Sequence, residues 1–146
     1  MGYKLGVDAK LYLNTGTFAA PVWSEVTNAR DVTVPLEASE ADASRRGGGG
    51  FKEYLPGLID AGIEFDLLYD SADPNFATLR TAFFARAPID VAAVDGDITT
   101  TGTQGLRFIG AVTGFPKEEP LEEGQAFSVT LKPTPNADSS PQWMTD

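Results

Sequence analysis

Apolar and polar residues alternate with a period of two over most of the chain, the pattern of half-buried β-strands. In the longest such stretch, residues 59–70, isoleucine, phenylalanine and leucine alternate with acidic residues. The pattern predicts strands at 5–13, 32–36, 59–70, 89–94, 106–115 and 126–131. With so many short strands and few long connections, the chain is predicted to form mainly antiparallel sheet.

One segment has helical spacing instead. Asp73 can cap a helix that starts with Pro74, a residue suited to the first helical position because it lacks an N–H. Phe76, Leu79 and Phe83 then fall on one face. The predicted fold is therefore an antiparallel β-sandwich or barrel with one flanking α-helix.

Two segments do not suit a compact isolated domain. Residues 37–57 form a long stretch with four consecutive glycines, which lack intrinsic order, and with apolar side chains that a free loop would expose. Residues 134–146 are rich in proline, serine and asparagine but contain Trp143. We expect a single domain at 1–133, carrying the long loop, followed by an extended C-terminal arm at 134–146.

Composition narrows the possible functions. The chain of 146 residues contains no cysteine and no histidine, which excludes disulfides, thiol chemistry, Cys/His zinc sites and His-dependent catalysis. With 21 acidic and 11 basic residues, its net charge is −10. Such a surface repels phosphate backbones and anionic lipids. No apolar run approaches the ~20 residues of a membrane span, and residues 1–13 lack the pattern of a secretion signal.

The remaining chemical motifs are weak. Asp95-Gly96-Asp97 lacks the further ligands of a calcium loop and is better explained as a hairpin turn. Glu64 and Asp66 share one strand face and could be an acid–base pair, but a solvated acidic face is the simpler explanation. The glycines at 47–50 lack a phosphate-binding pattern, and the acidic residues at 118–123 suit an exposed turn. We expect no enzyme and no cofactor or metal.

The order and spacing of several segments resemble the major tail tube proteins of long-tailed bacteriophages. The segments are Asn28-Ala-Arg-Asp-Val-Thr-Val-Pro-Leu-Glu, Ile63-Glu-Phe-Asp-Leu-Leu-Tyr-Asp, residues 89–97, Gln104-Gly-Leu-Arg and Pro120-Leu-Glu-Glu-Gly-Gln-Ala-Phe-Ser-Val-Thr-Leu-Lys-Pro-Thr. The resemblance covers about residues 28–133. The run of four glycines at 47–50 departs from the pattern of that family.

The resemblance implies a virion protein whose copies form six-fold rings that stack into a hollow tail tube, assembled in the host cytoplasm. Its partners would be other copies of itself and the tail tip, tape measure and tail terminator proteins, with DNA only in transit and no membrane. The loop 37–57 would contact a neighbouring subunit. We expect contacts from Arg45, Arg46, Phe51 and Tyr54, and from Trp143 in the C-terminal arm, because cations and aromatic residues suit an acidic partner surface.

A tube that carries DNA would benefit from an acidic lining, because every basic residue that meets a phosphate slows release. Glu64 and Asp66 are candidates for that lining, with Arg107 and Lys132 on neighbouring strands to offset their mutual repulsion. The other interpretation is that this face meets solvent on the outside.

Two alternatives stay open from the sequence. A monomeric β-barrel module could bind a small molecule in an apolar cavity, with the long loop as a lid. A tube subunit could also belong to a bacterial injection device or to a domesticated tail-like particle rather than to a phage.

Overall fold

The computed structural model describes residues 3, 5–119, 121, 124–135 and 141–145. Within them the chain forms one α-helix, eleven strands and two short 3-10 turns. The helix is α1 (Pro74–Ala85), and the turns are η1 (Gly6–Asp8) and η2 (Arg46–Gly48). The strands are β1 (Lys10–Asn14), β2 (Trp23–Glu25), β3 (Ala29–Thr33), β4 (Leu36–Asp42), β5 (Tyr54–Ala61), β6 (Ile63–Leu68), β7 (Ile89–Val94), β8 (Gln104–Gly114), β9 (Lys117–Glu118), β10 (Ala126–Pro133) and β11 (Gln142–Thr145).

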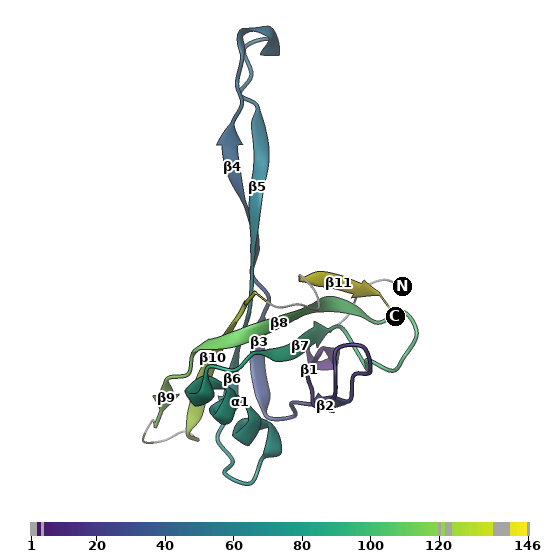
Figure 1. Ribbon diagram of the computed structural model, residues 1–146, viewed down its shortest axis with the longest axis vertical. Coiled ribbons are helices and arrows are strands. Elements are labelled where there is room, and N and C mark those ends of the chain that lie inside the picture. Colours follow the sequence, from purple (N-terminus) through teal and green to yellow (C-terminus); the bar gives the residue numbers. More distant parts are fainter. Residues whose placement is uncertain (1–2, 4, 120, 122–123, 136–140, 146) are drawn as a thin grey trace.

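Nine strands form one antiparallel sheet in the order β2-β1-β7-β8-β10-β6-β3. The strand β11 pairs with the first half of β8, and β9 pairs with β10. The helix α1 lies against the body at the end opposite the protruding β4–β5 pair (Figure 1). An antiparallel β fold with one flanking helix is what the sequence predicted.

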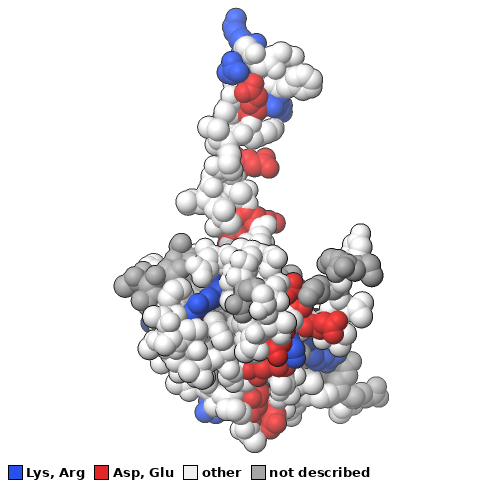
Figure 2. All heavy atoms as spheres, turned by 90° about the vertical axis from the view of Figure 1, so that its right-hand side faces the viewer, with Lys and Arg blue, Asp and Glu red and all other residues white. Residues whose placement is uncertain are grey.

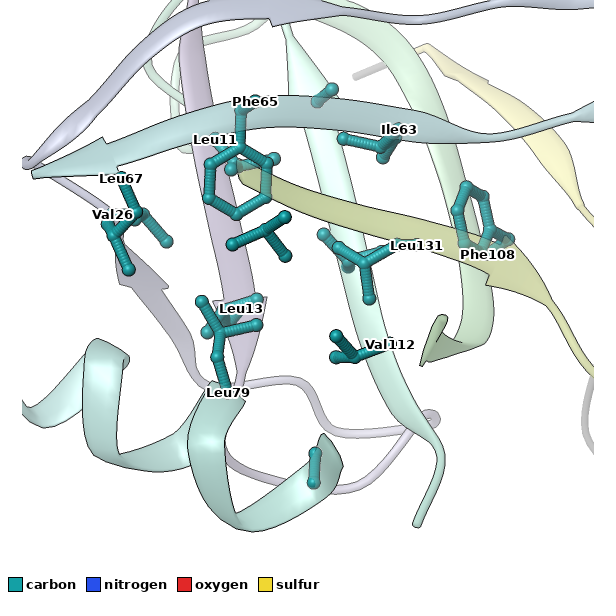
Figure 3. Close-up of a cluster of buried hydrophobic side chains, with 14 of the residues drawn as sticks. Leu11, Leu13, Val26, Ile63, Phe65, Leu67, Leu79, Phe108, Val112 and Leu131 are labelled. Atoms are coloured by element: carbon teal, nitrogen blue, oxygen red, sulfur yellow. The ribbon is translucent and has the colours of Figure 1, made fainter. Parts of the chain in front are cut away.

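The core lies on the concave face of this sheet. Alternate residues of β1, β6, β7, β8 and β10 point into it, and α1 adds Phe76, Leu79 and Ala82 (Figure 3). Leu13, Ile63, Leu67, Leu79 and Leu131 are each at most 1% exposed. Full burial of one such side chain contributes about 1.5–3 kcal/mol, so these alternating positions provide most of the stabilisation of the fold.

The helix begins and ends with recognisable caps. The Asp73 carboxylate accepts a hydrogen bond from the Asn75 N–H, and Pro74 occupies the first turn, as predicted. Arg86 adopts a left-handed conformation at the C-terminal end. The helical residue Phe76 joins a cluster of stacked and edge-on rings with Tyr69, Phe115 and Phe127, and this cluster fixes α1 on the sheet.

The stretch 59–70 is not one strand, contrary to the sequence prediction. It divides at Gly62, whose N–H donates to the Pro35 carbonyl. The first part, in β5, pairs with β4 to form a separate two-stranded sheet, whereas β6 belongs to the main sheet. The loop predicted at 37–57 is therefore mostly a long β-hairpin, built from β4, β5 and the connection at residues 43–53.

The N-terminal prediction was also wrong in part. Residues 6–8 form the turn η1, and the strand starts only at Lys10. Leu5 and Val7 alternate correctly for a strand but are exposed, because no neighbouring strand covers them within the described residues. The predicted strand at 32–36 is likewise replaced by the end of β3 and the start of β4.

Candidate assembly surface

The hairpin of β4 and β5 extends far beyond the body of the subunit (Figure 1). Every residue of β4 is exposed, and so is every residue of β5 before Ala61. Its large apolar side chains include Phe51 and Leu58, which are 78% and 87% exposed. A two-stranded hairpin is at best marginally stable alone in water, and contiguous exposed apolar surface is typical of protein interfaces. The hairpin is therefore a candidate surface for assembly.

The tip of the hairpin, residues 43–53, is nevertheless ordered by local hydrogen bonds. The Ala43 N–H donates to the Glu53 carbonyl at 2.8 Å, and the Glu53 N–H donates to the Ser44 hydroxyl at 3.0 Å. Hydrogen bonds from the Ser44 hydroxyl and N–H lower the pKa of Asp42. Gly49 and Gly50 have φ angles of 69° and 87°, which glycine adopts without steric cost. The glycines thus form a defined turn rather than a free linker.

Charge is segregated along the hairpin (Figure 2). Basic residues gather at the tip, where the Arg45 guanidinium lies 3.5 Å from the Glu53 carboxylate. Acidic residues follow the strands below, and Glu37 stands directly opposite Asp60 in the ladder. Like charges at opposed positions repel, and Lys132, at 3.7 Å from Asp60, compensates one of them. A basic tip on an acidic subunit favours an acidic partner.

The structure gathers the four predicted loop contacts at this far end of the hairpin. Arg45, Arg46, Phe51 and Tyr54 are all exposed there. Their contact with a neighbour stays a prediction, because the structure contains one subunit.

Two of the predicted lumen residues share the convex face of the main sheet. Glu64 pairs with Thr130 and Asp66 with Ser128 in the β6–β10 ladder, so their side chains lie on the face opposite the core. The Ser128 hydroxyl donates to the Asp66 carboxylate at 3.2 Å. Lys132 continues the same face toward the hairpin. These side chains form a polar surface, which we call the convex polar face (Glu64, Asp66, Ser128, Thr130 and Lys132).

Arg107 does not join that surface. The residue is only 8% exposed, and its Nε donates to both Asp90 oxygens at 3.1 Å. The guanidinium also lies over the rings of Phe18 and Trp23, at 4.0 and 4.8 Å from their centroids. The interpretation that Arg107 offsets the charges of Glu64 and Asp66 is therefore wrong, because its charge is already matched by Asp90.

Trp143 lies in β11, which pairs with β8 of its own subunit. The indole is 57% exposed, and its N–H donates to the Gln104 side chain at 3.0 Å. The part of the predicted arm at 136–140 lies outside the described residues. The described end of the arm is thus held against its own subunit but leaves most of the Trp143 ring uncovered, and a contact of Trp143 with a neighbour stays a prediction.

Among the residues that the structure describes, no cluster of three or more acidic side chains could hold a metal ion, and no helix is long and apolar enough to cross a membrane.

The Asp95–Asp97 loop is a turn. The Thr99 N–H and hydroxyl donate to the Asp97 carboxylate at 2.9 and 2.7 Å, and these hydrogen bonds lower the pKa of Asp97. Glu118 and Glu119 are exposed as expected, but Glu118 belongs to the strand β9 rather than to a turn, and Glu119 pairs with Lys117 at 2.8 Å.

The fold is similar to that of chains in solved tail structures. No protein-family profile and no curated protein matches the sequence. The structure is similar to a chain in the tail of an empty gene transfer agent particle with C6 symmetry, with a TM-score of 0.75 and 15% identity over 98% of this chain and 100% of that chain. A chain in the virion of the native gene transfer agent particle gives a TM-score of 0.74 at the same identity and coverage. The SPP1 tail tube chain gives a TM-score of 0.69 and 13% identity, over 89% of this chain and 75% of that chain.

Proposed function

We propose that this protein is a structural subunit of a phage-like tail tube, assembled as stacked rings of six copies. The observation that carries the proposal is the projecting hairpin, an exposed apolar arm on a fold shared along the full length of chains from a six-fold tail. An isolated subunit has no use for such an arm, whereas in a tube another copy covers it.

The hairpin provides the contacts between copies in this proposal. Phe51 and Tyr54 supply large rigid apolar area, and Arg45 and Arg46 supply charge at the same end. Aromatic residues and arginine are the types enriched at the centres of protein interfaces. Trp143, half-exposed on β11, contributes a second contact near the base of the hairpin.

The convex polar face lines the lumen in this proposal. Glu64 and Asp66 present carboxylates there beside Lys132 and small hydroxyls, and Arg30 stands opposite Asp66 in the β3–β6 ladder. A surface with these carboxylates binds a phosphate backbone only weakly, so DNA can pass without specific binding. The role is structural rather than enzymatic, the location is the virion tail, and the tail tip, tape measure and tail terminator proteins are the further partners.

The similar structures come from gene transfer agents as well as from SPP1. The proposed tube could therefore belong to a phage, to a domesticated tail-like particle or to a related injection device.

The competing function, a module that binds a small molecule, requires the long hairpin to close over a cavity as a lid. The hairpin instead points away from the body (Figure 1).

Electron microscopy of the purified, concentrated protein tests the proposal. We expect rings and hollow tubes with six-fold symmetry in projection. A protein that stays monomeric at every concentration and remains so when added to preformed tail tips, or that yields only amorphous aggregates, would contradict it.

A further inference from the structure

A large open groove lies at the root of the hairpin. Its volume is about 880 Å³, and it opens between η1, β3 and the first half of β8. Its apolar lining includes Val7, Val32, Leu36, Val94, Leu106 and Trp143. A second hollow of about 280 Å³ shares Leu36, Leu106 and Trp143 and extends the apolar surface along β5 to Ile59. The groove has the size and character of a site that binds large side chains.

The course of β3 leaves this groove open. β3 is an edge strand that pairs only with β6 among the described strands. Its ladder is interrupted between Arg30 and Thr33, where Asp31 has a φ of 46°. An irregularity of this kind bends a strand and ends its regular pairing. The apolar residues behind β3 therefore stay accessible from outside.

Two carboxylates without an ion pair accompany the apolar lining, and one of them, Asp95, accepts a hydrogen bond from the Gln104 N–H at 3.1 Å. Asp31 and Asp95 both line the groove, and neither forms an ion pair within the described part of the chain. Lys10 also lines it but is engaged by Glu25 at 3.2 Å, which raises the pKa of Lys10. Arg30 is the remaining lining cation. A ligand that combines apolar groups with positive charge fits this arrangement.

The hairpin tip of this same protein has that chemistry. Residues 43–53 contain three of the eleven basic residues of the chain and one acidic residue, Glu53, which lies 3.5 Å from Arg45, so the tip keeps a net positive charge. Phe51 lies in this segment, Tyr54 follows shortly after, and both are exposed. The tip cannot reach the groove of its own subunit, because the hairpin starts beside the groove and extends away from it (Figure 1).

We propose that the groove receives the hairpin tip of a second copy, an inference that rests on the proposed tube function and names its acceptor site. Phe51 and Tyr54 of one copy fill the apolar groove of the next, and Arg45 and Arg46 meet Asp31 and Asp95 at its edge. Each copy then offers one tip and one groove. This head-to-tail contact is not self-complementary, so it propagates from copy to copy rather than closing a pair.

Disulfide trapping tests the contact, because the natural chain contains no cysteine. A Phe51→Cys variant and a Val32→Cys variant are mixed with an excess of unmodified protein, so that tubes form around them, and the assembled material is oxidised. We expect a covalent dimer that forms in the assembled material and not in dilute monomer, since a disulfide requires Cα atoms within about 7 Å. The matched control pairs Phe51→Cys with Phe84→Cys, an exposed position on α1. That pair is expected to stay unlinked.

A second measurement uses the charges. Asp31→Asn combined with Asp95→Asn removes both carboxylates, and asparagine tolerates the left-handed backbone at position 31. We expect the yield of the Phe51→Cys and Val32→Cys dimer to fall several-fold at low salt and to lose most of its salt dependence.

The outcomes separate the inference from the function on which it rests. Normal tubes without the cross-link to Val32→Cys, or with an equal cross-link to Phe84→Cys, overturn the groove contact and leave the tube function intact. Normal tubes in which the Val32→Cys thiol reacts as fast as in the free subunit show a groove still open to another occupant, such as a small apolar ligand, and also overturn it. Failure of the unmodified protein to assemble, both alone and with preformed tail tips, contradicts the proposed function itself.

Discussion

The guanidinium of Arg107 and the carboxylate of Asp90 form a buried ion pair across two neighbouring strands of the main sheet. The Asn14 side chain donates to the same carboxylate at 3.0 Å, and Arg107 also donates to the Phe18 carbonyl at 3.1 Å. The pair therefore ties the connection between β1 and β2 to β7 and β8. Removal of only one partner of such a buried pair strongly destabilises the fold, because the other charge is left desolvated and unpaired.

Asp90→Ala is expected to destabilise the subunit by about 3–5 kcal/mol, because it leaves the Arg107 charge buried and unpaired. Urea unfolding followed by tryptophan fluorescence measures the loss, since Trp23 lies over the same guanidinium. The double variant Asp90→Leu with Arg107→Met removes both charges and should recover much of the stability. A double variant less stable than Asp90→Ala would contradict this account.

Phe51→Ala combined with Tyr54→Ala should leave the unfolding midpoint of the subunit unchanged and impair polymerisation. Both side chains are exposed in the single subunit, so their removal costs little folding energy. Sedimentation and electron microscopy measure the polymer. Phe84→Ala, which removes an equally exposed aromatic ring from α1, is the control and should assemble normally. If the double variant formed unchanged tubes, the hairpin would not be part of the assembly contact.

Arg45→Gln combined with Arg46→Gln is expected to slow assembly at low salt by about tenfold or more. The tip cations steer the hairpin toward an acidic partner, and steering of this kind raises association rates and weakens as salt rises. Light scattering at several ionic strengths measures the rate. The control is Arg80→Gln on α1, which removes one positive charge; its guanidinium lies over the Phe76 ring and away from the hairpin. Equal slowing per charge removed would indicate a net-charge effect instead.

The strands that the sequence predicted correctly are those whose side chains bury on one face. In β10, Phe127, Val129 and Leu131 are buried and the residues between them are not. The alternation in the sequence therefore indicates directly which face of the strand packs against the core. The helix was predictable for the same reason, together with its Asp73 cap. These signals are local, and no partner is needed to interpret them.

The hairpin could not be predicted in the same way. β4 has the sequence Leu-Glu-Ala-Ser-Glu-Ala-Asp, which has weak strand propensity and no buried face. The alternation of residues 59–70 also continues through Gly62, so nothing in the pattern marks the point where the chain leaves one sheet for another. The pairing of Arg107 with Asp90 was missed because both residues are polar and register between β7 and β8 decides their contact.

Gly105→Ala should destabilise the subunit strongly, by about 1–3 kcal/mol or more. A methyl group at Gly105 would overlap the Ala93 carbonyl oxygen and lie 2.6 Å from the Val94 Cα, so β7 and β8 would have to separate. Thermal unfolding measures the effect. Gly6→Ala serves as the control because a methyl group there meets open space. A Gly105→Ala protein as stable as the unmodified one would show that the strands approach less closely.

Reaction of a cysteine at position 64 distinguishes a lumen from an outer wall for the convex polar face. Glu64 is exposed in the single subunit, so a Glu64→Cys thiol should react there with a small maleimide and with a bulky polymer-linked maleimide alike. In assembled tubes we expect the small reagent to react and the bulky reagent to be excluded, because only the small one diffuses along a narrow channel. Equal reaction of the bulky reagent with tubes and subunits would place Glu64 on the outside. Loss of reaction with both reagents would place it in a contact between subunits. Either result would require the acidic lining to come from another face.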